Sequence, residues 1–454
     1  MLMTEHGRCQ TFRRRRWTER LQASRSFRTL VWHIFHVRDS VPVAVPRQRI
    51  RLPNSAWATA IVGLLRGDLW DGPGIGQFEQ AFAAEIGTAE AVTVPSGRSG
   101  FHLLFDALGI ESGGEVICSA FGYPIVPFLV KSMGFSLKFV DCEMQTLGMD
   151  PDRLAASISS RTRAVIATHL YGVPCRVGEI AELSKAGGAT LIEDCAHCFG
   201  AMVGEQNVGS FGDAGCFSFE TSKVINTMGG GMVTVRDRDL AQRIRDAARA
   251  QPRNGLRWLA KRLLKTSFEA AVTNPLVFNL GVYPALRLAS GASDGHDRFA
   301  SGYHGDEISM SGKMGRYTNY QAQLGWKQMH TSAALNERRT ANAERLKNLL
   351  RDRVQFQEPA GPHVTANYML VASLMPNLRE VARQLLRVGV DTKHLYMRDC
   401  SRMFDNNAAF PNAARAEREV LHLPAFPQLS DLQIDEIAAK VAAVVADLDV
   451  ALAT

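Results

Sequence analysis

The lysine at position 223 lies in a sequence context that suits covalent chemistry. It closes the segment 216–223, which begins with an apolar run, and it precedes three consecutive glycines at 229–231. Upstream, Asp194 follows another short apolar run, inside the motif Glu-Asp-Cys-Ala-His at 193–197. A buried amine near a carboxylate can form an imine with the aldehyde of pyridoxal phosphate (PLP). The two motifs therefore predict a PLP site in which Lys223 forms the covalent link.

Asp194 is the candidate partner for the cofactor ring. It ends an expected strand, so it should lie at the C-terminal edge of a parallel sheet, where ligands bind. A carboxylate there can keep the pyridine nitrogen protonated, and the ring then withdraws electrons from the reacting carbon. Taken alone, the same aspartate is equally typical of a helix N-cap.

Three further features could hold the rest of the cofactor. Residues 96–99, Ser-Gly-Arg-Ser, lie between an expected strand and an expected helix, so backbone N–H groups at the helix N-terminus can bind phosphate. Ser218 is a second candidate phosphate donor, and Tyr123 follows a strand and could stack on the ring. Individually, these features are also typical of a plain turn, a structural serine and a core aromatic residue.

Short apolar segments alternate with helical segments from residue 52 onward. The segments expected to be strands are 91–94, 115–118, 137–141, 164–167, 189–193, 214–217 and 231–235. This alternation predicts an α/β fold with a largely parallel sheet that helices cover on both faces. A long helix is expected from Thr318 to about Leu350, followed by a smaller α/β segment with a strand at 368–371.

The length of 454 residues predicts more than one domain. We expect a basic, flexible leader at 1–51 and a large cofactor-binding domain at 52–245. A basic and apolar insertion at 246–313 separates this domain from a long helix and a small C-terminal domain at 314–454.

The net charge of +7 is concentrated in the leader. Residues 1–51 hold 12 Arg and 3 acidic residues, so the remainder of the chain carries a net charge of −2. The body of the protein therefore gives no indication of nucleic-acid binding. The leader lacks a long apolar core with a cleavage site, which favours a flexible arm, a surface anchor or an upstream start-codon artefact over a secretory signal.

Residues 243–265 are strongly basic, with eight Arg or Lys and one acidic residue, and an apolar stretch interrupted by prolines follows at 270–288. One interpretation is a solvated helix with an irregular insertion. The other is an interfacial helix that contacts anionic lipid or an acidic partner, which predicts a peripheral membrane contact through 243–290. No run of eighteen or more apolar residues occurs, so a membrane-spanning helix is not expected.

The eight cysteines lie mostly in apolar runs, as expected of buried thiols in a reducing cytosol. Cys195 and Cys198 form a CxxC pair, but no second pair follows at zinc spacing. Packing cysteines are therefore favoured over a redox or metal site, and no metal is predicted.

Several motifs, taken in order along the chain, resemble those of the DegT/StrS-type sugar aminotransferases. They lie at 71–79, 96–99, 162–172, 193–197, 218–223 and 316–325, and the similarity ends near 421–424. The resemblance covers most of residues 54–454 apart from the insertion. It implies the aspartate-aminotransferase-like fold of type I PLP enzymes, with a mostly parallel, seven-stranded sheet. It also implies a homodimer with active sites at the subunit interface.

The resemblance implies roles for the residues around the ring. Lys223 would form the internal aldimine, and Asp194 would pair with the pyridine nitrogen. His197 would lie beside the ring near its 3-hydroxyl group, and Tyr123 would stack on the opposite face.

For the phosphate, the resemblance implies Gly97, Arg98 and Ser218, the first two chiefly through backbone donors. Arg98 stands where the family commonly has a small hydroxyl residue, so one side-chain contact with the phosphate is missing or replaced. Arg316 is a candidate for binding an anionic substrate group. Met314 stands where the family usually has the asparagine of an Asn-x-Arg motif, and Glu220 where an aromatic residue or histidine is common.

The sequence thus predicts a PLP-dependent aminotransferase of the cytoplasm. It would move an amino group from glutamate or glutamine to a keto-sugar, carried as a sugar nucleotide, by way of pyridoxamine phosphate. Two alternatives stay open. A PLP-dependent sugar dehydratase of the same family would carry histidine in place of Lys223. A non-catalytic regulatory or membrane-associated protein could retain the fold, although Lys223, Asp194 and His197 together argue against it.

Overall fold

The computed structural model describes residues 44–53, 55–289, 315–404 and 409–453. Most of the expected leader lies outside these residues, as do Met314 and the 290–313 part of the insertion. Within the described ranges, no helix combines the length and the apolar character needed to cross a membrane.

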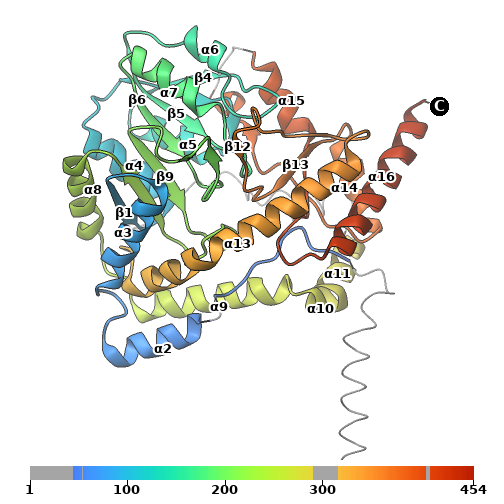
Figure 1. Ribbon diagram of the computed structural model, residues 1–454, viewed down its shortest axis with the longest axis horizontal. Coiled ribbons are helices and arrows are strands. Elements are labelled where there is room, and N and C mark those ends of the chain that lie inside the picture. The colour runs from blue at the N-terminus through green and yellow to red at the C-terminus, as the bar shows by residue number, and fades with distance from the viewer. Residues whose placement is uncertain (1–43, 54, 290–314, 405–408, 454) are drawn as a thin grey trace, which may run out of the picture. The chain divides into compact units, whose positions relative to one another are not determined.

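A seven-stranded sheet forms the centre of the fold (Figure 1), in the spatial order β1-β10-β9-β6-β5-β2-β4. Its strands are β1 (Glu90–Val94), β2 (Glu115–Ser119), β4 (Ser136–Val140), β5 (Thr162–Thr168), β6 (Thr190–Asp194), β9 (Ala214–Ser218) and β10 (Gly231–Val235). Six strands run in one direction and β10 runs against them. All seven predicted strands are confirmed, and their bounds agree to within a few residues.

Helices cover both faces of this sheet. They are α3 (Gly74–Ile86), α4 (Gly97–Leu108), α5 (Ile125–Ser132), α6 (Pro151–Ala155), α7 (Val177–Ala186) and α8 (Arg238–Ala250). Alternate strand residues pack into different cores: Val116 and Ile166 join the core that includes α4, α5 and α8, whereas Ile117 and Val165 join the core that includes α7. Both faces are buried, which explains why the strands are continuous apolar runs.

The link between β9 and β10 positions Lys223. Parallel neighbours need a long crossover, whereas antiparallel neighbours can be joined by a loop. Because β10 is antiparallel to β9, residues 219–230 connect the two strands at one edge of the sheet. Asp194 ends the parallel strand β6 at the same edge, and Ser96 follows β1 there and bridges to Gly230.

A second, antiparallel sheet follows the long helix α13 (Asn319–Leu350), whose N-cap Thr318 forms a capping box with Gln321. This sheet has the order β11-β13-β16-β14. The elements are β11 (Gln355–Phe356), β13 (Val371–Leu374), β14 (Lys393–His394), β16 (Val420–Leu423), α14 (Leu378–Arg387), η3 (Cys400–Met403), α15 (Pro411–Glu419) and α16 (Asp431–Ala453). Small additional pairings involve β3 (Phe121–Gly122), β7 (Met202–Val203), β8 (Gln206–Asn207), β12 (Val364–Thr365) and β15 (Arg398–Asp399).

The strand expected at 368–371 is displaced toward the C-terminus and forms β13 at 371–374. Tyr368 adopts a left-handed backbone conformation with φ of 43°, which interrupts a strand. Leu370 donates its backbone N–H to the carbonyl of Tyr171 rather than to a strand partner. Residues 368–370 therefore contact the loop after β5 and join the two parts of the protein.

The described part of the insertion forms a row of helices. They are α9 (Leu256–Val272), α10 (Pro275–Val277), the π-helical turn η2 (Phe278–Val282) and α11 (Tyr283–Ala289). Figure 1 shows this row along the same side of the protein as α2 (Ala56–Arg66). Leu259 and Leu263 of α9 pack with Ala60 of α2 and Leu324 of α13 in one core.

Candidate active site

A cavity of about 200 Å³ lies at the C-terminal edge of the seven-stranded sheet. All seven residues that the sequence assigns to the cofactor line it: Gly97, Arg98, Tyr123, Asp194, His197, Ser218 and Lys223. They come from the ends of β1, β6 and β9 and from the loops that follow β3 and β9. The fold thus brings together residues that are far apart in the sequence.

Lys223 is half-buried at the end of the turn that follows β9, where its backbone N–H donates to the carbonyl of Glu220 over 2.9 Å. Burial lowers the pKa of its amine to about 8, although the nearby carboxylates of Asp194 and Glu220 act in the opposite direction. A neutral amine is therefore accessible near physiological pH, as an attacking nucleophile requires.

The association of PLP with the cofactor-free protein should accelerate as the pH rises through about 8. Only the neutral form of Lys223 attacks an aldehyde, and a pKa of about 8 makes that form about tenfold more abundant at pH 9 than at pH 7. Stopped-flow absorbance at excess PLP measures the rate. A rate that stays constant or falls over this interval contradicts the assignment.

Asp194 is the last residue of β6 and is buried. Its Oδ1 accepts a hydrogen bond from the backbone N–H of Ala196 over 3.1 Å. Burial raises the pKa of this carboxyl, while the Ala196 hydrogen bond and the charge of Lys223 oppose the rise. The carboxylate therefore faces the cavity with a fixed orientation and a lysine as its nearest described cationic neighbour.

His197 presents a defined nitrogen to the cavity. Its Nδ1 accepts the backbone N–H of Tyr171 over 3.1 Å, so the ring proton resides on Nε2, which lies 3.5 Å from the Tyr396 hydroxyl. Burial lowers the pKa of His197 well below its usual value, and the charges of Lys223 and Lys393 add to the effect. The imidazole is therefore neutral, with Nε2–H available as a donor.

The N-terminus of α4 forms the anion-binding end of the cavity. Ser96 caps the helix, accepting from the backbone N–H of Ser99 over 3.1 Å while the Ser99 hydroxyl accepts from the Ser96 N–H over 2.8 Å. The backbone N–H groups of the first helical turn, beginning at Gly97, point toward this end of the cavity, as helix N-termini that bind anions do. A side chain at position 97 would meet Cβ of Ser218 at 3.2 Å, so glycine permits the close approach of these two elements.

The sequence analysis missed two residues near this cavity: Tyr396, which lines it, and Lys393, the first residue of β14, which lies beside Tyr396. Tyr396 lies with its ring 5.7 Å from those of both Tyr123 and His197, and the Lys393 amine lies 3.6 Å from the centre of the Tyr396 ring. Burial lowers the pKa of Lys393 to about 7. In the sequence, a lysine near a tyrosine does not by itself indicate a binding site. Lys393 and Tyr396 reach the site only because the small C-terminal domain packs against the large sheet.

The structure does not bring Arg316 to this cavity. Its guanidinium pairs with the carboxylate of Asp71 at 3.1 Å, and Arg253 pairs with the same carboxylate at 2.7 Å. These residues border a separate hollow beside α3 and α8. Contact between Arg316 and a substrate at Lys223 of the same subunit is therefore not supported.

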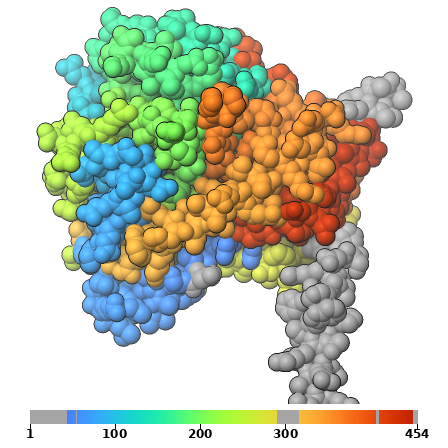
Figure 2. Space-filling model, in the orientation of Figure 1, coloured from blue at the N-terminus to red at the C-terminus, as the bar shows by residue number. Residues whose placement is uncertain are grey.

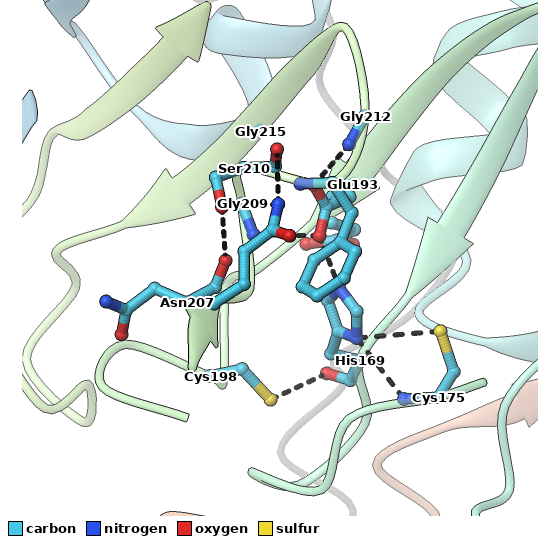
Figure 3. Close-up of polar contacts among 12 residues, drawn as sticks. His169, Cys175, Glu193, Cys198, Asn207, Gly209, Ser210, Gly212 and Gly215 are labelled. Carbon is cyan, nitrogen blue, oxygen red and sulfur yellow. Dashed lines mark hydrogen bonds and ion pairs between the residues drawn. The ribbon is translucent and has the colours of Figure 1, made fainter. Parts of the chain in front are cut away.

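Glu193 anchors the loop beneath the cavity (Figure 3). This fully buried carboxylate accepts the backbone N–H groups of Gly209 at 2.8 Å, Phe211 at 2.7 Å and Gly212 at 2.8 Å, and it contacts Nε2 of His169 at 3.1 Å. His169 Nδ1 in turn accepts the N–H of Cys175 over 3.3 Å. The network fixes the end of β6, and therefore the orientation of the adjacent Asp194.

The cysteines near this network are buried. All seven cysteines in the described ranges are buried and free. His169, Glu193 and Cys195 have donor atoms within 4.8 Å of one another, a spacing that could accommodate a metal ion. The oxygens of Glu193 and both nitrogens of His169 already have protein partners, which identifies the cluster as hydrogen-bonded support.

Replacing Glu193 with alanine should lower the free energy of unfolding by about 3–5 kcal/mol, because three backbone N–H groups and a histidine lose their buried acceptor. Glu193→Gln keeps one acceptor oxygen and should cost about half as much. Urea unfolding of the cofactor-free protein measures both. A loss below about 1 kcal/mol for the alanine variant would show that the network does not stabilise the loop.

The geometry of the cavity fits PLP. The helix N-terminus with Ser218 offers donors for a phosphate, Asp194 offers a buried carboxylate for a ring nitrogen, and Lys223 offers a nucleophilic amine. Tyr123 and His197 supply flat surfaces for the ring. Glu220 also lines the cavity, and its carboxylate is paired with Arg262 at 3.5 Å.

A family model matches residues 58–442 and is described as the DegT/DnrJ/EryC1/StrS aminotransferase family. The chain belongs to this family. The resemblance to DegT/StrS-type aminotransferases that the sequence predicts is therefore confirmed.

Individual relatives extend the comparison. GDP-perosamine synthase of Escherichia coli O157:H7 is 38% identical over 169 residues, which are 37% of this chain and 46% of that protein. L-glutamine:2-deoxy-scyllo-inosose aminotransferase of Streptomyces lividus is 32% identical over 200 residues, 42% of this chain and 47% of that protein. In these matches the chain spans about half the length of the curated relatives.

Among solved structures, the aminotransferase TlmJ from Streptoalloteichus hindustanus matches with a TM-score of 0.71 and 25% identity. The match covers 89% of this chain and 100% of that one. The predicted α/β fold of a PLP-dependent aminotransferase, with its mostly parallel sheet, is thereby confirmed.

Proposed function

We propose that the protein is a PLP-dependent aminotransferase that moves an amino group from glutamate or glutamine to a keto-sugar carried on a nucleotide. The observation that carries this proposal is the convergence of Lys223, Asp194 and His197 with an anion-binding helix N-terminus in one cavity. Lysine at position 223 also disfavours the dehydratase alternative, in which histidine takes its place.

Each residue has a separable task in this reaction. When bound, PLP supplies an aldehyde carbon that takes up the amino group. Its ring withdraws electrons from the reacting carbon. Lys223 Nζ moves the proton at that carbon, and its lowered pKa suits it to accept and return the proton. The Asp194 carboxylate would stabilise a positive charge on the ring nitrogen of the bound group, and the neutral His197 would offer its Nε2–H to that group as a hydrogen-bond donor.

A second cavity, of about 330 Å³, supports a phosphorylated acceptor because it reaches Lys223 and is lined by cations. Its basic side chains are Arg49, Arg51, Lys223, Lys327, Arg339 and Lys393, and its lining includes no Asp or Glu. Within the described parts of the chain, none of these six forms an ion pair with a carboxylate. Even without Lys223 and Lys393, whose pKa values burial lowers to about 8 and about 7, three arginines and Lys327 border this hollow. Such a lining favours a ligand that brings several negative charges, as the diphosphate of a sugar nucleotide does.

The insertion helps to build this cavity. The guanidinium of Arg49 donates to the carbonyl of Ala270 at 2.8 Å, and the backbone N–H of Ile50 donates to the Thr273 hydroxyl at 3.1 Å. The Arg51 carbonyl accepts a hydrogen bond from the side-chain amide of Asn226 over 2.9 Å. Asn226 lies in the same loop as Lys223, residues 219–230. The end of α9 and the loop after β9 thus hold the segment 48–53 against the cavity.

Replacing Arg339 with glutamine should raise the KM for a nucleotide-linked keto-sugar about 10–100-fold, the effect of losing one or two charge-assisted hydrogen bonds. The reaction with the amino donor alone should change little, because that substrate does not extend to α13. Steady-state kinetics with varied acceptor and single-turnover kinetics with the amino donor alone test this. Arg351→Gln, an exposed arginine at the end of the same helix, is the matched control; equal effects in the two variants would refute the role of the cavity.

The activity is tested by incubating the PLP-bound protein with glutamate or glutamine and a panel of keto-sugar nucleotides. Mass spectrometry should find a product in which an amino group replaces the carbonyl oxygen of one of the sugars. Turnover of none of them, with both donors, would remove the proposed acceptor class.

We infer further that the protein acts in the cytoplasm as a homodimer, with part of its surface at the inner face of a membrane. Free, buried cysteines and the family resemblance support the first two statements. The exposed side chains of α2 and the insertion support the third.

A further inference from the structure

Helix α2 has its apolar side chains on the outside. Its inner side is made of small residues, among them Ala56 and Ala60, which pack into the core with α13. The large apolar residues Trp57, Ile61, Leu64 and Leu65 are exposed, and Leu65 has 82% of its surface accessible. Their spacing of four, three and one residues places them on one stripe of the helix. Such a stripe marks a surface that meets something other than water.

The insertion carries a second set of exposed apolar side chains. They are Leu256, Leu264, Phe268, Leu276, Val277, Leu280 and Leu288, with Phe268 66% and Leu280 77% accessible. Helices α2 and α9 share one core, and the row α9 to α11 continues along the same side of the protein (Figures 1 and 2). We call these exposed residues of α2 and of α9 to α11 the apolar face.

Basic side chains accompany the apolar face, and acidic ones are few. Arg257 and Lys261 are exposed on the outward side of α9, close along the helix to Leu264 and Phe268. The sequence contains no Asp or Glu at 52–67 or at 247–268. Glu269 is half-buried and is paired with Lys265 at 3.6 Å. The face therefore combines apolar area with a net positive charge.

We propose that the apolar face binds the surface of an anionic membrane. Apolar side chains on a helix enter the boundary between headgroups and acyl chains by about 5–10 Å, while Arg and Lys remain at the level of the phosphates. Trp57 suits this boundary because its ring is apolar and its N–H is polar. This inference is independent of the proposed reaction, because it needs neither the cofactor nor the substrate.

Charge decides between a membrane and a second copy of this chain. A twofold interface would bring the same patch together from both subunits, and the segments 52–67 and 247–268 hold no Asp or Glu that could pair with Arg257 and Lys261 of the other copy. Anionic lipids supply the opposite charge over the whole face. The membrane is therefore the complementary partner.

Co-sedimentation of the full chain with vesicles tests the proposal. Wild-type protein should bind vesicles that contain phosphatidylglycerol and should bind pure phosphatidylcholine much more weakly. The double variants Ile61→Gln/Leu65→Gln and Leu264→Gln/Phe268→Gln should each lose at least about tenfold in affinity. Arg257→Gln/Lys261→Gln should lose about 25-fold, about fivefold for each charge.

Controls distinguish this face from the rest of the surface. Leu432→Gln removes an equally exposed leucine on α16, and Lys185→Gln removes an exposed lysine on α7; both should bind vesicles like wild type. All variants keep the basic leader, so a loss of binding belongs to the face itself. Circular dichroism and the visible absorbance of bound PLP report whether each variant is folded.

The proposal is overturned if wild-type protein does not sediment with anionic vesicles or if the face variants bind like wild type. It is also overturned if the face variants change the molecular mass in solution, because the face would then join two subunits. If the double apolar variants fail to fold, the exposed charge variant and the decline of wild-type binding with salt still decide the question.

Discussion

Replacing Lys223 with alanine is expected to lower turnover by at least about 10⁴-fold, because one amine both links the cofactor and moves the proton. The visible absorbance of PLP bound through Lys223 should disappear as well. The variant should remain folded, since the change removes an amine whose burial lowers its pKa to about 8 and so disfavours its charged form. Absorbance spectra and single-turnover kinetics with glutamate measure both effects.

Lys393 is the matched control for this experiment. It is also half-buried near the cavity, and its pKa is lowered to about 7, but its amine lies over the ring of Tyr396. Lys393→Ala should keep the visible absorbance of bound PLP. Borohydride reduction followed by peptide mass spectrometry should find the cofactor on the peptide that contains Lys223. Loss of the absorbance in Lys393→Ala together with its persistence in Lys223→Ala would reverse the assignment.

Replacing Asp194 with asparagine is expected to lower kcat about 10²–10³-fold, the effect of removing one preorganised charge from a buried site. Asparagine keeps an oxygen for the Ala196 N–H, so the fold of the loop should not change. It removes the negative charge that stabilises a protonated ring nitrogen. Stopped-flow kinetics of the reaction with glutamate isolate this effect from acceptor binding.

Glu220→Gln serves as the comparison for Asp194→Asn. Glu220 lines the same cavity, but its carboxylate pairs with Arg262 of α9 at 3.5 Å. Its neutralisation should change kcat less than about tenfold. Equal losses in the two variants would indicate a general effect of charge in the cavity rather than a specific contact of Asp194 with the ring.

The central sheet could be predicted from sequence because its physical signal is local. Strands such as β2 and β5 are buried on both faces and therefore appear as short apolar runs between turns. The strand expected at 368–371 was misplaced because Asn367 and Leu370 donate backbone N–H groups to the loop at Tyr171 and Gly172, a long-range contact that leaves no periodic pattern.

Residues such as Asp194 and Ser218, which the sequence places at strand ends, could be expected to meet in one cavity because the C-terminal ends of parallel strands meet at one edge. His197 was proposed for the cofactor from the family resemblance alone. The sequence did not reveal Tyr396 and Lys393, which reach the cavity through the packing of the small domain on the large one. Nor did it reveal Arg339, because the sequence predicted α13 without indicating which side of this helix faces the cavity. Arg316 was assigned to substrate by family pattern, whereas its ion pair with Asp71 depends on the tertiary arrangement.

The basic segment 243–265 left two interpretations open, a solvated helix with an irregular insertion and an interfacial helix. Helix α9 buries Leu259 and Leu263 against α2 and α13, so it is an integral part of the fold. Its outer side nevertheless exposes Leu264 and Phe268 beside basic residues. Sequence alone could not predict that α2 exposes its own large apolar residues next to this helix.

Transfer of isotopically labelled nitrogen tests the central claim most directly. The PLP-bound protein is mixed with glutamate labelled at its amino nitrogen and with a keto-sugar nucleotide, and the sugar is analysed by mass spectrometry. The account predicts that the label appears as an amino group on the sugar with wild-type protein and not with Lys223→Ala. Amino-sugar formation that is unaffected by the Lys223→Ala change, or no labelled sugar with any keto-sugar nucleotide tested, would contradict it.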